Sequence, residues 1–138
     1  MTGSDTKNPS PATVLIVEDS VLVRLAIAAY LRDCGYRVIE AASSDEGLIV
    51  LQQSATMIDI LFSDADVAGA LDAFSLCQWS RKNRPKTKIV MAASPKGAAV
   101  AAGKLCEEGP YLAKPYEPQA VEDYIRRLLA VQNIEESS

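Results

Sequence analysis

The stretch Thr13-Val14-Leu15-Ile16-Val17-Glu18-Asp19-Ser20 joins an uninterrupted apolar run to a pair of carboxylates. Apolar runs without polar alternation are typical of parallel strands that are buried on both faces. A second run, Ile60-Leu61-Phe62-Ser63, ends in the same way at Asp64. If the two runs are neighbouring parallel strands, their carboxyl ends meet at one edge of the sheet, where open α/β folds bind ligands. We therefore expect Glu18, Asp19 and Asp64 to converge.

Three convergent carboxylates predict a site for a hard cation. Oxygen ligands suit Mg²⁺, which keeps several waters and usually bridges to a phosphate. Lys114 follows the short apolar stretch Tyr111-Leu112-Ala113 and adds an ammonium at the same edge, where it can balance phosphoryl charge. These residues indicate phosphoryl transfer. In a purely structural alternative, Glu18 and Asp19 only cap the next helix, but no helix cap needs three carboxylates and a lysine.

Strand-like and helix-like segments alternate along the chain. Ser20 and Gly35 are the expected cap and stop of the first helix, and Ser43 with Glu46 fits a capping box that opens the second. Strands are expected over 13–17, 37–40, 58–63, 88–92 and 111–113, and helices over 20–34, 43–53, 71–84, 97–107 and from 118 onwards. Five strands alternating with five helices predict an α/β fold with a doubly wound five-stranded parallel sheet, in flavodoxin-like order 2-1-3-4-5. The three carboxylates then lie at its switch point, between strands one and three.

Length and composition limit the other possibilities. The 138 residues suffice for one domain with a real core, expected over 12–131, with a disordered segment over 1–11 and a fraying tail over 132–138. The net charge of −4 and the sparse basic residues argue against a nucleic-acid partner. No segment is long and apolar enough for a signal peptide or a membrane span, so we expect a cytoplasmic protein with no membrane contact.

Histidine is absent from the sequence, which excludes Ser-His and Cys-His catalysis and histidine-ligated metals. The cysteines Cys34, Cys77 and Cys106 have no paired spacing that indicates zinc or a disulfide framework. We expect each of them to be a small buried apolar residue. Chemistry in this chain must therefore use carboxylates or lysine.

Together the motifs resemble a stand-alone, chemotaxis-regulator-like receiver domain of the two-component response regulators, from about Thr13 to Val131. The resemblance rests on the first strand with its acidic pair, on the strand that ends at Asp64, and on Tyr111-Leu112-Ala113-Lys114-Pro115-Tyr116, which resembles the fifth strand of the family with its lysine. It implies a single-domain regulator that accepts a phosphoryl group on Asp64 from a sensor histidine kinase or a phosphotransfer protein. Such a protein signals through altered protein–protein binding and is not a conventional enzyme.

The resemblance also implies roles for the site residues. Mg²⁺ is held by Glu18, Asp19 and Asp64 and by the backbone carbonyl of Asp66. Asp64 is the phosphoacceptor, and Lys114 pairs with a phosphoryl oxygen. The peptide bond between Lys114 and the proline that follows it is expected to be cis.

One departure from the family pattern concerns the switch. Ala92 stands where receivers normally carry threonine or serine, and alanine cannot hydrogen-bond a phosphoryl group. In the family that hydroxyl is coupled to rotation of an aromatic residue on the fifth strand, which Tyr111 matches. Asp66 and Ser94 match the variable positions that tune hydrolysis of the acyl phosphate in the family.

Two alternative functions remain open. The segment Asp64-Ala65-Asp66-Val67 also resembles the Asp-x-Asp motif of haloacid-dehalogenase-type phosphatases, but there an acidic pair follows the last strand, whereas here it follows the first. The stronger alternative is a receiver-like interaction module that signals without phosphorylation, which Ala92 suggests. A downstream partner, or a second copy in a homodimer, is expected to contact the face formed by the fourth helix, the fifth strand and the last helix.

Overall fold

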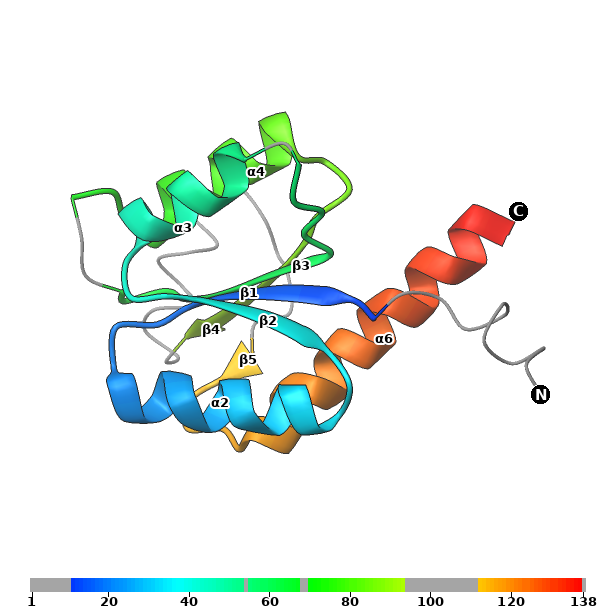
Figure 1. Ribbon diagram of the computed structural model, residues 1–138, viewed down its shortest axis with the longest axis horizontal. Coiled ribbons are helices and arrows are strands. Elements are labelled where there is room, and N and C mark those ends of the chain that lie inside the picture. The colour runs from blue at the N-terminus through cyan, green and yellow to red at the C-terminus, as the bar shows by residue number, and fades with distance from the viewer. Residues whose placement is uncertain (1–10, 54, 68–69, 94–111, 138) are drawn as a thin grey trace.

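The computed structural model describes residues 11–53, 55–67, 70–93 and 112–137, with side chains as far as Val131. Within these residues the chain forms a parallel sheet that is covered by helices on both faces (Figure 1). The elements are β1 (Thr13–Val17), α2 (Val21–Asp33), β2 (Arg37–Ala41), α3 (Ser44–Gln52), β3 (Ile60–Asp64), α4 (Ala73–Asn83), β4 (Lys88–Ala93), β5 (Leu112–Ala113) and α6 (Pro118–Ser137).

The sheet has the predicted order, β2-β1-β3-β4-β5, and every neighbouring pair of strands is parallel. The fold class is therefore confirmed. The described residues contain four of the five predicted helices, and the fifth, expected over 97–107, lies outside them. The backbone of α6 runs from Pro118 through Ser137, into the segment 132–138 that the sequence predicts to be a fraying tail.

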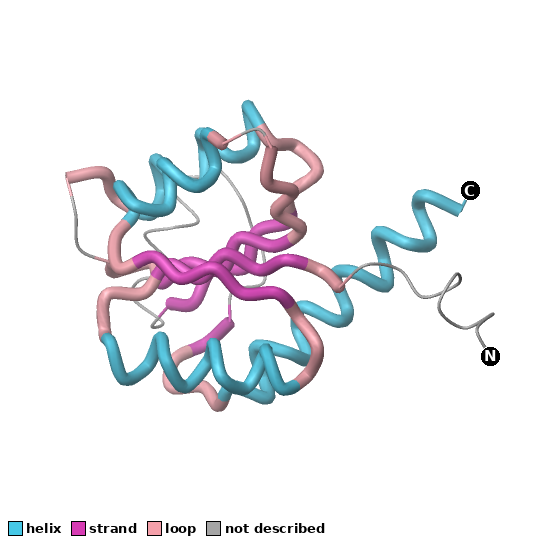
Figure 2. Tube along the Cα trace, viewed as in Figure 1, coloured by secondary structure: helices cyan, strands magenta, loops and turns pink. Residues whose placement is uncertain are grey.

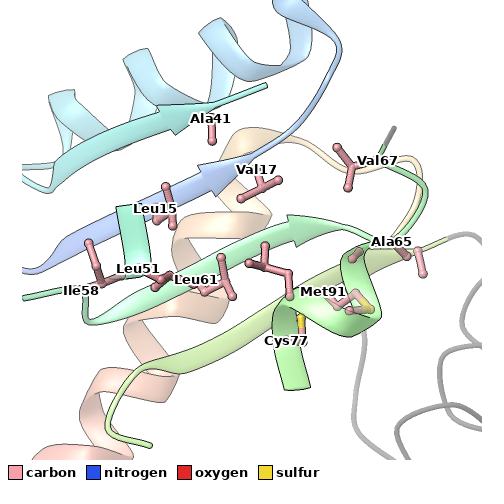
Figure 3. Packing of buried hydrophobic residues seen from close by; sticks show 13 residues of the cluster. Leu15, Val17, Ala41, Leu51, Ile58, Leu61, Ala65, Val67, Cys77 and Met91 are labelled. Atoms are coloured by element: carbon pink, nitrogen blue, oxygen red, sulfur yellow. The ribbon is translucent and has the colours of Figure 1, made fainter. Parts of the chain in front are cut away.

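The two faces of the sheet are covered by different pairs of helices. Figures 1 and 2 show α2 and α6 against one face and α3 and α4 against the other. Every residue of β1 is buried, and its side chains alternate between two core clusters. Leu15 and Val17 point into the cluster under α3 and α4, which Figure 3 shows. Val14 and Ile16 point into the cluster on the side of α2 and α6.

The helix caps follow the local sequence. Ser20 caps α2, since its side chain accepts a hydrogen bond from the backbone N–H of Val23. Gly35 follows the end of α2 with a φ of 100°, a conformation that favours glycine. At α3 the Ser43 hydroxyl accepts from the N–H of Glu46. The Glu46 carboxylate accepts from the backbone N–H that precedes Ser43, one residue earlier than in the standard capping box.

The cysteines are only partly as expected. Cys77 is buried, whereas Cys34 is exposed because it lies at the C-cap of α2, where the chain turns at the surface. The expectation of a buried Cys34 is therefore wrong, and Cys106 lies outside the described residues. In the described part of the chain no helix combines the length and apolar character needed to cross a membrane.

Candidate functional site

The three carboxylates converge at the strand ends. Glu18 and Asp19 follow β1, and Asp64 is the last residue of β3. The register pairs Val17 of β1 with Ser63 of β3. Glu18 and Asp64 are the residues that directly follow this pair, so they lie side by side. One carboxylate oxygen from each of Glu18, Asp19 and Asp64 lies within 4.8 Å of the other two. Glu18 and Asp64 are buried and Asp19 is exposed, so this acidic cluster meets solvent on the side of Asp19.

The electrostatics of the acidic cluster show most clearly at Glu18. Its pKa is raised from 4.5 to about 7, chiefly because burial removes water from the carboxylate. A hydrogen bond of 2.9 Å from the backbone N–H of Ser20 to Glu18 Oε2 lowers the pKa, while the charges of Asp64 and Asp19 raise it further. Like charges held together in this way favour a cation between them.

Lys114 lies directly beside Asp64. Its Nζ donates a hydrogen bond to Asp64 Oδ1 and lies 3.5 Å from Asp66 Oδ2. The backbone N–H of Lys114 donates to the carbonyl of Ala93 at 3.1 Å, which ties the residue to the end of β4. Burial by itself would lower the pKa of Lys114, but the hydrogen bond to Asp64 and the charges of Asp64 and Asp66 raise it. The side chain is therefore an ammonium. The bond between Lys114 and Pro115 is cis, as predicted.

The loop after β3 is held from two sides. The backbone N–H of Asp66 donates to Asp64 Oδ1 at 3.1 Å, so the loop begins by folding over the Asp64 carboxylate. Further along, the N–H groups of Ala70 and Leu71 donate to the two carboxylate oxygens of Asp45, at 3.1 Å each. The sequence reasoning missed this role of Asp45. Its position in the first turn of α3 signals only a favourable interaction with the helix dipole.

Arg24 is a second residue that the sequence reasoning missed. Its Nη1 donates to the backbone carbonyl of Glu18 at 2.7 Å, and its Nε pairs with Glu40 Oε1 at 3.3 Å. Through these contacts α2 and β2 hold the turn that carries the acidic pair. The contact with Glu40 joins two elements that no local pattern connects, so the sequence carried no signal for it.

A sequence model of the response regulator receiver domain matches residues 14–126. The chain belongs to this family. Receiver domains are signalling modules that interact with histidine kinases and downstream effectors, and they are not conventional enzymes. The phosphatase alternative for the segment 64–67 is thereby set aside.

Several known proteins are similar to this receiver. A probable transcriptional regulator, ycf27 of Cyanophora paradoxa, is 28% identical over 84% of this chain and 47% of its own length. The sensor kinase CckA of Brucella abortus is 30% identical over 88% of this chain and 13% of its own length. The chain therefore spans about half or less of these relatives. A CheY-like receiver domain protein from Methanospirillum hungatei has the same fold, with a TM-score of 0.78 at 24% identity over 91% of this chain and 99% of that one.

The departure at Ala92 lies within the site of this receiver. Ala92 is fully buried on β4 and is paired in register with Asp64. Its carbonyl accepts a hydrogen bond of 2.9 Å from the N–H of Ala65, and its side chain is a methyl group with nothing to donate. Tyr111 and Ser94, the other residues expected in the switch and in tuning, lie outside the described residues.

Proposed function

We propose that this receiver accepts a phosphoryl group on Asp64 from a phosphohistidine of a partner protein and signals through changed protein binding. The observation that supports this most strongly is the placement of Asp64. Its carboxylate is buried among two further carboxylates that suit a divalent cation, and it receives a hydrogen bond from the Lys114 ammonium. A carboxylate that only ended a strand would need neither the two nearby carboxylates nor the ammonium.

In the proposed reaction a carboxylate oxygen of Asp64 is the nucleophile. It forms a bond to phosphorus while the bond from phosphorus to the donor imidazole nitrogen breaks, and the electron pair of that bond stays on the nitrogen. An imidazole already protonated on its other nitrogen leaves as neutral histidine, and Asp64 becomes an acyl phosphate. Lys114 balances the charge of the transferred oxygens. The 138 residues contain no histidine, so the donor histidine lies outside them.

The acidic cluster fits Mg²⁺, since its side chains offer only oxygen ligands and one of them faces solvent. Glu18, Asp19 and Asp64 would hold the ion together with the backbone carbonyl of Asp66. When bound, Mg²⁺ neutralises charge that gathers on the phosphoryl oxygens. Neighbouring carboxylates that repel one another without a cation support this assignment.

The phosphodonor must approach the open side of the acidic cluster, where α2 begins. Four apolar residues near the start of α2 are exposed: Val21, Leu22, Val23 and Leu25. Exposed apolar residues that gather beside a reactive group favour a protein contact. We therefore place the contact with the kinase or phosphotransfer protein on this apolar start of α2. The downstream partner, or a second copy, is proposed to contact the face of β5, α6 and the helix expected over 97–107, of which only β5 and α6 are described.

A second candidate function follows from Ala92. Without a hydroxyl on β4, the chain could keep the receiver fold and bind partners independently of phosphorylation. The two functions differ in one measurable product, the acyl phosphate on Asp64.

The test is incubation with acetyl phosphate, or with a phosphorylated histidine kinase, followed by mass spectrometry of the intact protein and its peptides. We expect one phosphoryl group on Asp64 that depends on Mg²⁺ and is absent from Asp64→Asn. Asp66→Asn is the matched control, because it removes a neighbouring carboxylate from the same loop and keeps the nucleophile. Label that persists in Asp64→Asn would refute the proposal. Absence of any label would favour the phosphorylation-independent module.

A further inference from the structure

The hydroxyl group of Tyr116 is buried on the same face of the sheet as the site. Its Oη is buried and, among the described residues, has no hydrogen-bond partner. Its ring packs edge-on against Phe62, with ring centroids 5.9 Å apart and an interplanar angle of 67°. Phe62 precedes Asp64 by two residues on β3, and residues two apart on a strand share a face. Tyr116 therefore packs on the face of the sheet to which Asp64 belongs.

The other site residues belong to this same face. Glu18, Asp64 and Lys114 each come two residues after an apolar residue of the cluster against which Tyr116 packs. These apolar residues are Ile16, Phe62 and Leu112. Ala92 itself is a member of that cluster. The carboxylates and the ammonium thus lie at the carboxyl edge of the face, and the Tyr116 ring lies next to them on the core side.

Two charges of the site act on this hydroxyl. Burial first, and then the charges of Glu18 and Asp64, raise the pKa of Tyr116 above its ordinary value. The phenol therefore stays protonated and offers an O–H donor. The charges of both carboxylates act on the phenol, but its O–H donates a hydrogen bond to neither of them.

A buried hydroxyl without a partner destabilises the folded protein, because it has lost its hydrogen bonds to water. Phenylalanine would make the same ring contact with Phe62 without this cost. A tyrosine at this position is therefore best explained by a partner that is present in another state of the site. The anionic oxygens of a phosphoryl group would be such acceptors.

We propose that Tyr116 donates a hydrogen bond to the phosphoryl group on Asp64, and that it supplies the neutral hydroxyl that β4 lacks at Ala92. This assignment rests on the proposed phosphorylation of Asp64. Lys114 contributes the charged donor and Tyr116 the uncharged one, which approaches from the core side of the site.

The test uses beryllofluoride with Mg²⁺ as a non-covalent mimic of the phosphoryl group. Tyr116→Phe is compared with wild type and with Tyr36→Phe, a control that removes the hydroxyl bonded to Glu122 Oε2 at 2.8 Å, away from the acidic cluster. We expect the mimic to bind Tyr116→Phe about ten to a hundred times more weakly, as for loss of one hydrogen bond to a charged group. Tyr36→Phe should keep the wild-type affinity.

Two further measurements separate this role from a structural one. Without ligand, Tyr116→Phe should melt at the wild-type temperature or above it, because an unpaired hydroxyl is removed. In wild-type protein with ¹³Cζ-labelled tyrosine, the Tyr116 signal should shift when the mimic binds. Equal affinity of wild type and Tyr116→Phe, or an unmoved Tyr116 signal while wild type binds the mimic, would overturn this inference and leave Asp64 phosphorylation intact. If wild type neither bound the mimic nor accepted a phosphoryl group, both proposals would fall.

Discussion

The carboxylates of Glu18, Asp19 and Asp64 lie close together in the folded protein, and their mutual repulsion lowers its stability. The oxygens lie within 4.8 Å of one another, and burial of Glu18 strengthens the repulsion because little water remains to screen it. A ligand that binds only the folded protein relieves this repulsion and stabilises the fold by mass action. We therefore expect divalent cations to stabilise this receiver.

Metal addition should raise the melting temperature of the wild-type protein. At a Mg²⁺ concentration of about 100 times the dissociation constant, the gain is about 2.7 kcal/mol, or roughly 10 °C for a domain of this size. Asp19→Asn removes a proposed ligand and should lose most of this rise. Asp66→Asn should keep it, because the proposed ligand at that residue is the backbone carbonyl. Differential scanning fluorimetry with and without EDTA measures the effect. A wild-type melting temperature that saturating Mg²⁺ leaves unchanged would contradict the assignment.

Among the elements, α3 approaches the sheet unusually closely at one residue. A Cβ added to Gly47 would lie 2.9 Å from Val17 Cγ2 and 3.3 Å from Leu76 Cδ2. Both neighbours are fully buried, so neither side chain has room to move away. Glycine is therefore required here by packing, at some cost in helix propensity.

Gly47→Ala should destabilise the protein. Overpacking costs about 1–3 kcal/mol, and the better helix propensity of alanine returns at most about 1 kcal/mol. Val17→Ala removes the methyl group that causes the contact, so Gly47→Ala in that background should be neutral or stabilising. Urea unfolding of the four proteins of this double-mutant cycle gives the coupling. Additive free energies of unfolding would show that the contact with Val17 is not the cause.

The exposed apolar residues at the start of α2 are the proposed contact with the phosphodonor protein. Leu22 is 81% exposed, and we expect Leu22→Ala to slow phosphotransfer from a histidine kinase several-fold, because it removes apolar contact area. Its reaction with acetyl phosphate should be unchanged, since that donor needs no docking surface. Ile49→Ala on α3, 57% exposed in wild type, is the matched control and should behave like wild type with both donors. Equal loss with both donors would place the effect of Leu22 in the reaction itself.

For the molecule as a whole, the question is how the site is coupled to the surface. A ligand shifts a two-state equilibrium only through contacts that differ between the two states. The methyl group of Ala92 cannot offer a phosphoryl group such a contact from β4. We expect Lys114 and the proposed Mg²⁺ to supply most of the compensation of phosphoryl charge. Phosphorylation of this receiver should therefore be possible while its conformational response is small.

Ala92→Thr should enlarge that response. NMR spectra recorded with and without beryllofluoride should show muted changes around Tyr111 in wild type and larger ones in the variant. Ala92 is fully buried, so the added atoms should also lower the free energy of unfolding by about 1–3 kcal/mol. A full wild-type response at Tyr111 that the substitution leaves unchanged would show that this receiver switches by another route.

Much of the fold and the centre of the site follow from local patterns. The apolar run from Thr13 to Val17 indicates a buried strand, Ser20 and Gly35 mark the ends of α2, and the parallel alternation places Glu18 and Asp64 at one edge. These features depend on residues that are close in sequence and on the general rule that the carboxyl ends of parallel strands meet. A single sequence therefore carries enough information to predict them.

Other features depend on contacts between segments that are far apart in the chain. Three features are of this kind: the hydrogen bonds between Asp45 and the loop after β3, the close packing of Gly47 on Val17, and the buried hydroxyl of Tyr116. Each is determined by strand register and by the distance of a helix from the sheet, which result from packing of the whole core. No periodicity, cap or motif encodes such distances, so only the folded structure shows that Tyr116 lies next to the site.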